Sequence, residues 1–344
     1  MKKISLDKLP ELYKRIADSA DLFLPIAKSG QVDFAKWNEG AEVDLVKLKT
    51  TKSAKDVFFP QTQHLVDFEV NGKEVKVGEA KFPEEKQVIF GVKACDCKSF
   101  ELLDMAFTED FGDKFYEARR ANTTIVTLAC GKPDEACFCK AYGIDPANPN
   151  GDVSTWIVDG YLFWTANTEK GVALTESVKD LFEDGDDKVV EEKKAEIEKL
   201  IDAMPFAKID MSHLEEGKLL DKFNSKKWAE LSEACLGCGT CTFVCPTCQC
   251  YDIRDFKTNT DKVIRTRCWD SCMFSDFTKC AHGNPRTTQL QRFRQRFMHK
   301  LVYFPSNHDG VYSCVGCGRC VQKCPSMLNI IKVIKALGEE GKDE

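Results

Sequence analysis

The stretch CLGCGTCTFVCP, residues 235–246, places four cysteines at fixed intervals and ends on a proline. The same spacing returns in CVGCGRCVQKCP, residues 314–325, which begins 79 residues further along the chain. Both stretches follow the pattern C-x2-C-x2-C-x3-C-P and place a glycine on each side of the second cysteine. The C-terminal part of the chain is therefore built around two copies of one cysteine motif.

The duplicated motif is typical of bacterial ferredoxins that hold two iron–sulfur clusters. The first three cysteines of each motif wind around one [4Fe-4S] cube, and the fourth, fixed before proline, reaches the other cube. Glycine lets the backbone wrap closely around the sulfur atoms. The spacing predicts one cluster on Cys235, Cys238, Cys241 and Cys324, and a second on Cys314, Cys317, Cys320 and Cys245.

Zinc is the alternative occupant of these motifs. Structural zinc takes four ligands, usually as two separated pairs, and has no use for a third cysteine at the same close spacing followed by Cys-Pro. We therefore favour two iron–sulfur clusters over a pair of zinc knuckles.

The composition indicates a reducing compartment. The chain has 18 cysteines among 344 residues and a formal net charge of -6. Its start, MKKISLDKLPELYKRIADSA, has the pattern of a charged amphipathic helix rather than a signal peptide, and no run reaches the roughly 18 apolar residues of a membrane span. We expect a soluble, cytoplasmic protein whose clustered thiols bind metal, and the modest charge does not favour nucleic-acid binding.

The fold class that we expect is an α/β N-terminal domain followed by a two-[4Fe-4S] ferredoxin-like domain with a long insertion that contains cysteines. Residues 1–205 form the α/β domain, and residues 206–344 form the ferredoxin-like domain, which is interrupted from about 249 to 308. Asn-Gly at 71–72 and Asp-Gly at 159–160 each lie between apolar runs and predict hairpins. Between the domains, the charged segment 183–204 is typical of a solvated helix or a linker.

Two further predicted strands lead directly to cysteines. QVIFGVK, residues 87–93, precedes Cys95 and Cys97, and we expect both cysteines in a loop before a helix at SFELLDMAF. TTIVTL, residues 123–128, precedes Cys130. In α/β folds, sites form where the ends of adjacent strands lie side by side.

These strand ends predict a third metal centre in the N-terminal domain. A loop after the second strand adds two more cysteines in ACFCK. Four thiolates from the two loops suit a [4Fe-4S] cube, with a structural zinc or free thiols as the alternatives and Cys97 as the spare cysteine. The predicted ligands are Cys95, Cys130, Cys137 and Cys139.

The insertion carries more cysteines beside cations. Its phrase RTRCWDSC places Arg265 and Arg267 among thiols, and cations near a cluster raise its reduction potential. We expect a further cluster or a zinc site here with its fourth ligand open, while the alternative is that these cysteines are small buried hydrophobic residues. The ligands proposed for this site are Cys248, Cys250 and Cys272.

A basic helix follows the insertion. TTQLQRFRQRFMHKLVYF places Arg292, Arg296 and Lys300 on one stripe beside a phenylalanine stripe. This pattern predicts a solvated face over a core, or a docking face for an acidic partner.

The chain lacks the motifs of several enzyme classes. No G-x-G-x-x-G follows a predicted strand, and no G-x-x-x-x-G-K-[ST] loop is present, so nothing predicts a resident nucleotide site. No histidine belongs to a nucleophile constellation, and we assign no catalytic residue and no cofactor beyond the clusters.

The chain resembles the iron–sulfur β subunit of cytosolic sulfhydrogenases and the related A subunit of anaerobic sulfite reductase. The resemblance lies in the phrases FFPQTQHLVDF, FGVKACDCKSFELLD, CFC, CLGCGTCTFVCPTCQCYD, RCWDSC and SCVGCGRCVQKCP, which cover nearly the whole chain. It implies the same cluster cysteines, including Cys248, Cys250 and Cys272. Cys97, Cys268 and Cys280 are additions to the family pattern and leave the ligands of the insertion open.

The resemblance implies a non-catalytic electron-transfer subunit of a soluble multi-subunit oxidoreductase. Its partners are a flavin- and NAD(P)-binding subunit and a catalytic or ferredoxin-linked subunit, between which it relays single electrons. Two other functions stay open on the sequence alone. One is a self-sufficient enzyme that binds flavin or deazaflavin in the N-terminal domain, and the other is a zinc-stapled scaffold without a redox role.

Overall fold

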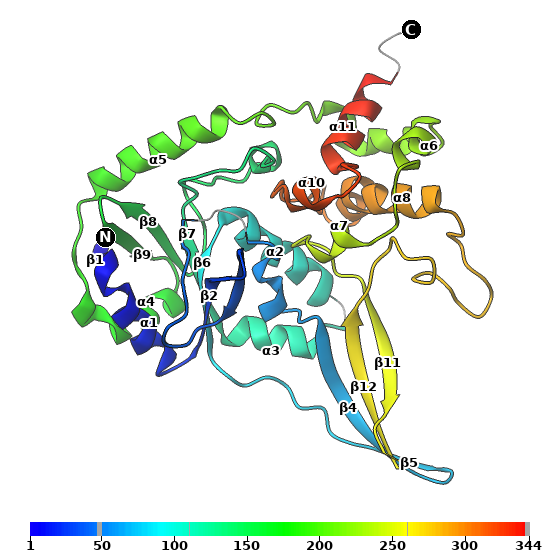
Figure 1. The fold of residues 1–344 in the computed structure, drawn as a ribbon, viewed down its shortest axis with the longest axis horizontal. Helices are drawn as coiled ribbons and strands as arrows, with labels where there is room; N and C mark the ends of the chain where they lie inside the picture. The colour runs from blue at the N-terminus through cyan, green and yellow to red at the C-terminus, as the bar shows by residue number, and fades with distance from the viewer. Residues whose placement is uncertain (47–49, 110, 260, 341–344) are drawn as a thin grey trace.

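The computed structural model describes residues 1–46, 50–109, 111–259 and 261–340. An eight-stranded sheet with the order β10-β1-β9-β8-β7-β6-β2-β3 forms the N-terminal part (Figure 1). The central strands β2, β6, β7 and β8 are parallel, and the outer strands pair antiparallel. The strands are β1 (Lys2–Ser5), β2 (Asp21–Lys28), β3 (Gln31–Lys36), β6 (Gln87–Val92), β7 (Thr123–Leu128), β8 (Val153–Val158), β9 (Tyr161–Ala166) and β10 (Glu183–Asp184).

Helices cover both faces of this sheet because its central strands are apolar on both sides. Phe90 of β6 packs with α1 in one buried cluster, whereas its neighbour Ile89 packs with α2 and α3 in another. A third buried cluster joins α5 to β8 and β9 through Trp156 and Phe163. The helices are α1 (Leu9–Ala17), α2 (Ala94–Phe107), α3 (Lys114–Asn122), α4 (Glu169–Ser177) and α5 (Asp187–Asp202).

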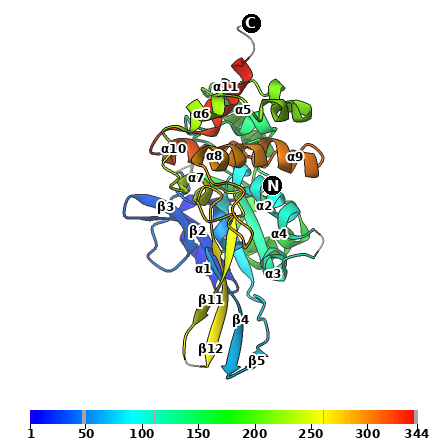
Figure 2. The ribbon, with the colours of Figure 1, turned by 90° about the vertical axis from the view of Figure 1, so that its right-hand side faces the viewer.

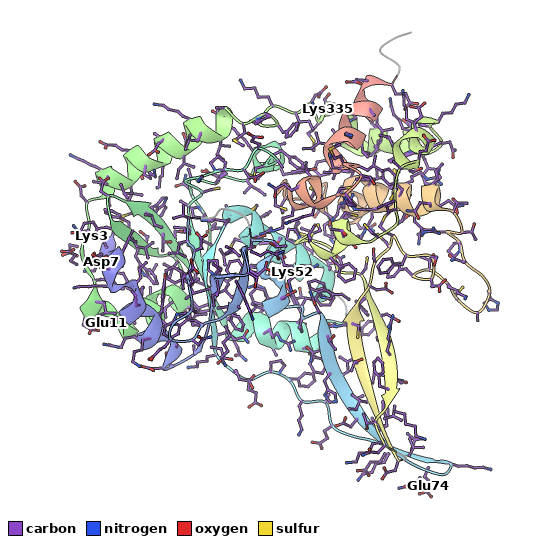
Figure 3. All side chains as sticks on the ribbon, in the orientation of Figure 1. Lys3, Asp7, Glu11, Lys52, Glu74 and Lys335 are labelled. Carbon is purple, nitrogen blue, oxygen red and sulfur yellow. The ribbon has the colours of Figure 1, made fainter. Side chains whose placement is uncertain are left out.

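A second, four-stranded antiparallel sheet with the order β11-β12-β4-β5 projects from the rest of the molecule in both views (Figures 1 and 2). We call it the β arm; Glu74, labelled in Figure 3, lies near its tip. Two of its strands come from before the expected boundary at residue 205 and two from the insertion, so the halves share this sheet. Its strands are β4 (Thr62–Asn71), β5 (Glu74–Val77), β11 (Tyr251–Lys257) and β12 (Lys262–Trp269).

The C-terminal part is a small helical body around the two cysteine motifs. Trp228, Phe293 and Phe297 form its core with the apolar face of the last helix. A π-helical turn, His299–Tyr303, continues α8. The helices are α6 (Lys227–Ser232), α7 (Thr240–Phe243), α8 (Gln289–Met298), α9 (Phe304–Asn307), α10 (Arg319–Lys323) and α11 (Ile330–Glu339).

The structure confirms the predicted hairpins and corrects one local prediction. Gly72 and Gly160 have φ of +65° and +79°, as glycine in such turns allows. Cys95 and Cys97, however, lie on a helix rather than in a loop, because α2 begins only one residue after Lys93. The backbone N–H groups of Asp96 and Cys97 both donate to the Lys93 carbonyl at 2.9 Å, which starts the helix directly at the strand end.

Candidate metal centres

The first group of thiols lines one pocket. Two of them accept hydrogen bonds there: Gln289 Nε2 donates to Cys235 Sγ at 3.3 Å, and the Leu328 backbone N–H donates to Cys324 Sγ at 3.2 Å. Donors aimed at sulfur are what a thiolate-bound cluster requires. The pocket brings together the four cysteines predicted for the first cube, which are Cys235, Cys238, Cys241 and Cys324.

The second group forms around Cys245, the fourth cysteine of the first motif. Burial raises the pKa of the Cys314 thiol to about 11, against the opposing effect of Lys300, and the neighbouring thiols of Cys320 and Cys245 raise it further. Burial also raises the pKa of Cys317, and the thiols of Cys245 and Cys320 raise it further. Cys324 thus lies with the first three cysteines of the other motif, and Cys245 lies near Thr247, which donates to the Ser313 carbonyl directly before Cys314.

The loop that holds Cys137 and Cys139 lies directly on the second motif. The Phe138 backbone N–H donates to the Gly316 carbonyl at 2.8 Å. A Cβ on Gly316 would lie 2.5 Å from the Phe138 carbonyl carbon, so only glycine permits this approach. The N-terminal cysteines and the second motif are thus parts of one packed region.

Three of the four predicted N-terminal ligands interact electrostatically with one another. Burial raises the pKa of Cys139 to about 12, with Cys137 as the next cause, and Cys139 in turn raises the pKa of Cys95 after burial, Asp96 and Cys317. Cys130 is linked to Cys95 by a shared neighbour, Lys93. Burial lowers the pKa of Lys93, while the thiols of Cys130 and Cys95 raise it. The parallel pairing of β6 and β7 places these strand ends side by side, as the sequence predicted.

Cys97 lies apart from these thiols. Its Sγ donates to the Asn150 carbonyl at 2.8 Å, and burial raises its pKa to about 12. The side chain borders a different pocket, with Asp104 and Arg120 on its wall. It is a buried, hydrogen-bonded thiol.

The thiols proposed for the insertion lie at the root of the β arm. The hydrogen bond with Cys272 lowers the pKa of Cys250 to about 7, whereas the hydrogen bond with Cys245 raises the pKa of Cys248. Cys268, by contrast, lies on β12 near Thr266, and Cys280 is exposed. Within the described ranges, no three His, Cys, Asp or Glu side chains are placed to hold a single metal ion.

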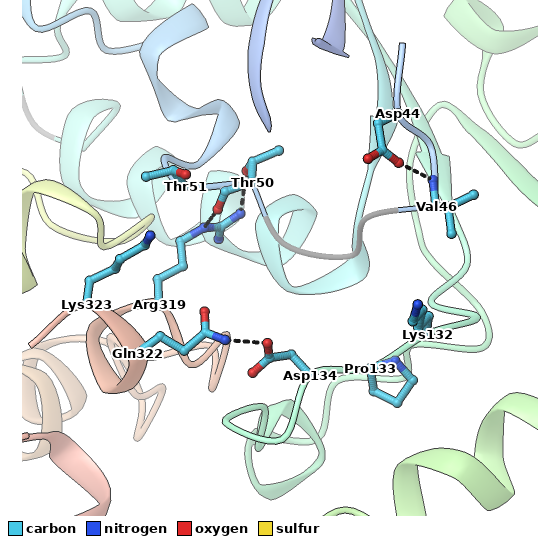
Figure 4. Close-up of a pocket in the computed structure, with 10 residues that line it drawn as sticks. All are labelled: Asp44, Val46, Thr50, Thr51, Lys132, Pro133, Asp134, Arg319, Gln322 and Lys323. Atoms are coloured by element: carbon cyan, nitrogen blue, oxygen red, sulfur yellow. Dashed lines mark hydrogen bonds between the residues drawn. The ribbon is translucent and has the colours of Figure 1, made fainter. Parts of the chain in front are cut away.

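A buried ion pair joins the two halves next to the cysteines. Both Arg319 side-chain Nη atoms bind Asp96, at 2.5 and 2.7 Å, which connects α10 to α2. The guanidinium also donates to Thr50, and Gln322 reaches Asp134 across a cavity of about 460 Å³ (Figure 4).

Comparison with known proteins identifies the family. Residues 234–328 match the 4Fe-4S dicluster domain. The chain is 32% identical to sulfhydrogenase 2 subunit beta of Pyrococcus furiosus over 340 residues, which cover 98% of this chain and 98% of that protein. The chain belongs to the sulfhydrogenase beta-subunit family. No solved structure matches it.

Membership in the sulfhydrogenase beta-subunit family, together with the dicluster domain, confirms an iron–sulfur protein of the electron-transfer class. The predicted C-terminal dicluster domain and the mixed α/β region before it are likewise confirmed. No helix in the described part of this family member is long and apolar enough to cross a membrane.

The basic helix of this sulfhydrogenase beta-subunit homologue does not carry the predicted solvated face. Arg296 and Lys300 are only 3% and 4% exposed. The prediction was wrong because Arg296 lies in a pocket with thiols and Lys300 is hydrogen-bonded to Thr247 and Ser313. The residue pattern of the helix alone does not show what lies opposite. Sequence reasoning named both cations but missed their buried position beside the cysteine motifs, which makes them functional candidates.

The contact between the N-terminal loop and the second motif leads to a stability prediction. We expect Gly316→Ala to lower the thermal unfolding midpoint of the anaerobic protein more than Gly310→Ala does. Both glycines have positive φ, which costs an alanine about 1–2 kcal/mol. Only at Gly316 does the new Cβ meet another backbone, since nothing lies within 4 Å at Gly310. Equal midpoints for the two variants would contradict the packed contact.

Proposed function

We propose that this chain relays single electrons inside a multi-subunit oxidoreductase. The observation that supports the proposal is that Cys324, from the second motif, lines the pocket of the first motif, while Cys245, from the first motif, lies beside the second. Two clusters held in this way would lie within one small body. The N-terminal thiols of Cys137 and Cys139 flank Phe138, which contacts Gly316 of the second motif, so a third cluster there would lie next to the second.

The ligand sets follow from these contacts. The first two clusters are assigned to the groups described around Cys324 and Cys245. A third [4Fe-4S] cluster is assigned to Cys95, Cys130, Cys137 and Cys139. A further cluster is proposed at Cys248, Cys250 and Cys272, where Cys245 is the neighbouring thiol but is assigned to the second cluster. A single zinc ion is not proposed there, because the described thiols are not placed to hold one metal ion together.

The chain's own residues prepare these sites. Each cube supplies one-electron redox chemistry when bound. Burial excludes water from Cys317 and Cys139, Gln289 donates to Cys235, and the glycines let the loops close around the sulfur atoms. Thiolates held in a shell of low polarity with few donors favour a low potential, and each donor or cation raises it.

The partners are proposed from the relative's name and the family pattern. The relative is named a beta subunit of a sulfhydrogenase, and we propose that this chain also works with other subunits. We propose a flavin- and NAD(P)-binding subunit or a ferredoxin-linked subunit as one partner, and a catalytic subunit as the other. A reducing cytoplasm would keep the thiols available for iron.

Metal and flavin analysis of the anaerobically purified chain tests this function. We expect about twelve irons per chain, from three four-iron clusters, and no flavin. The chain alone should not oxidise NAD(P)H, and should pass electrons only once partner subunits are added. About eight irons would remove the third cluster from the proposal, and about sixteen would add one at the insertion. A bound flavin with NAD(P)H oxidation would show a self-sufficient enzyme, and zinc with little iron would show a scaffold.

A further inference from the structure

Two cations of the α8 segment are buried without a carboxylate as the main partner. Arg296 lies in the last turn of α8, and Lys300 lies one turn further, in the π-helical turn. Removing charges from water is strongly unfavourable unless opposite charge compensates for it. π-Helical turns are rare and are frequently found at functional sites. The placement of these cations therefore requires an anionic neighbour.

Arg296 faces the first group of thiols and reaches toward the second. Its side chain lines the same pocket as Cys241 and Cys324. Its Nε is buried and has no hydrogen-bond partner among the described residues. Burial lowers its pKa, but nearby thiols outweigh burial and leave the pKa raised; these are Cys241, Cys320, Cys248 and Cys245. These thiols include members of both predicted cluster sets of the dicluster domain.

Lys300 connects the two segments that supply the second cluster. Its Nζ donates to Thr247 Oγ1 at 2.8 Å and to the Ser313 carbonyl at 2.9 Å. Thr247 Oγ1 is 3.3 Å from Cys245 Sγ, and Ser313 directly precedes Cys314. The ammonium group is thus held beside both ends of one ligand set.

We propose that Arg296 and Lys300 form a cationic bridge that lets the two clusters of the dicluster domain each hold one electron at similar potentials. The proposal rests on the proposed function, because it presupposes both clusters. A cube with four thiolate ligands is anionic, and each added electron increases the negative charge in a medium of low dielectric constant. An electron on one cluster therefore makes reduction of the other less favourable. A cation between them offsets this repulsion.

The bridge suits the exchange of electrons with a two-electron donor. An anionic reduced flavin on a partner subunit gives up two electrons and releases one proton to water. Each cluster takes one electron, so that the flavin is oxidised by two electrons and two clusters are each reduced by one. Because the two clusters have similar reduction potentials, both electrons can leave the donor. Arg296 offsets negative charge on both clusters, whereas Lys300 offsets it mainly on the second.

Redox titration of the full chain, followed by electron paramagnetic resonance, tests the bridge. In Arg296→Gln we expect the ratio of reduced to oxidised cluster, at a fixed solution potential, to fall about tenfold for both clusters, which is about 59 mV for a one-electron couple. In Lys300→Gln we expect this fall mainly for the second cluster, so that the two potentials move apart. Arg296→Lys should keep most of the wild-type potential.

Arg294→Gln is the matched control, since it removes a cation from the same helix. Arg294 donates to the Phe223 carbonyl at 2.9 Å and stacks on the Phe223 ring, away from the pocket of the first thiol group. We expect both potentials to stay at their wild-type values. A fall equal to that of Arg296→Gln would show a nonspecific charge effect and overturn the bridge.

Iron content separates failure of the bridge from failure of the function. Wild-type protein without the eight irons of the dicluster domain would refute the proposed function itself. If Arg296→Gln retains its iron and both potentials, the bridge is refuted while the relay stands. The wild type gives an independent measurement that needs no variant to fold: two dicluster potentials more than about 120 mV apart, a hundredfold difference in equilibrium, would refute the bridge.

Discussion

Replacing Cys324 by serine is expected to remove one cluster, about four irons per chain, from the anaerobically purified protein. Cys324 lies at the end of the second motif but lines the pocket of Cys235, Cys238 and Cys241. A serine hydroxyl does not supply the thiolate that the cube requires. Iron and acid-labile sulfide analysis measures the loss. The same change at Cys245 is expected to remove the other cluster of the domain.

Double variants show which cysteines share a cluster. Cys324→Ser with Cys235→Ser should lose no more iron than either change alone, because both ligands serve one cube. Cys324→Ser with Cys314→Ser should lose about eight irons. Effects that act on one unit are not additive, whereas those on separate units are. If instead the pair Cys324 and Cys314 behaves as one unit, each motif holds its own cluster and the exchange is refuted.

Cys97→Ser is the control for these variants. Cys97 is as buried as several proposed ligands, but its Sγ donates to the Asn150 carbonyl and lies outside the described thiol groups. We expect its iron content to equal that of the wild type. Iron lost on this change would place Cys97 among the ligands and overturn its assignment as the spare cysteine.

The cysteine spacing allowed the dicluster domain to be predicted because chain geometry near a cube is local. Three of the predicted ligands of each cluster lie within seven consecutive residues, for example Cys235 to Cys241, so spacing alone specifies the loop. The side-by-side ends of β6 and β7 were predictable for a related reason, since consecutive parallel strands in α/β sheets are usually neighbours. Local patterns with few geometric solutions are readable in this way.

Contacts between distant segments left no such signal. The approach of Phe138 to Gly316 depends on the packing of the two halves, and the glycine was already explained by its own motif. The buried cations Arg296 and Lys300 were missed because an amphipathic stripe looks the same whether water or thiolate covers it. The β arm was also hidden, since its strand pairing joins residues that are far apart in the sequence, such as Glu69 of β4 and Lys262 of β12.

Asp96→Asn is expected to destabilise the protein by about 3–5 kcal/mol, because it leaves the guanidinium of Arg319 buried without its counter-charge. The pair is 2–3% exposed and makes two hydrogen bonds. It connects α2, which carries Cys95, to α10, which carries Cys320. We therefore expect the unfolding midpoint to fall and iron to be lost first from the proposed third cluster, to which Cys95 belongs.

A double-mutant cycle separates the ion pair from the space that it fills. Asp96→Leu with Arg319→Met replaces both charges by apolar side chains and should recover much of the stability lost in either single variant, since a buried pair contributes little net once both members are removed together. Asp255→Asn is the matched control: its carboxylate also binds an arginine, Arg265, through two hydrogen bonds, at 2.7 and 2.8 Å, but at the exposed surface of the β arm. Solvent screens that pair, so we expect little change in the unfolding midpoint.

The contradicting result is an unfolding midpoint for the Asp96→Asn variant that is as high as that of the Asp255→Asn variant. It would mean that another group compensates the charge of Arg319, and that the cluster region holds the two halves together without this ion pair.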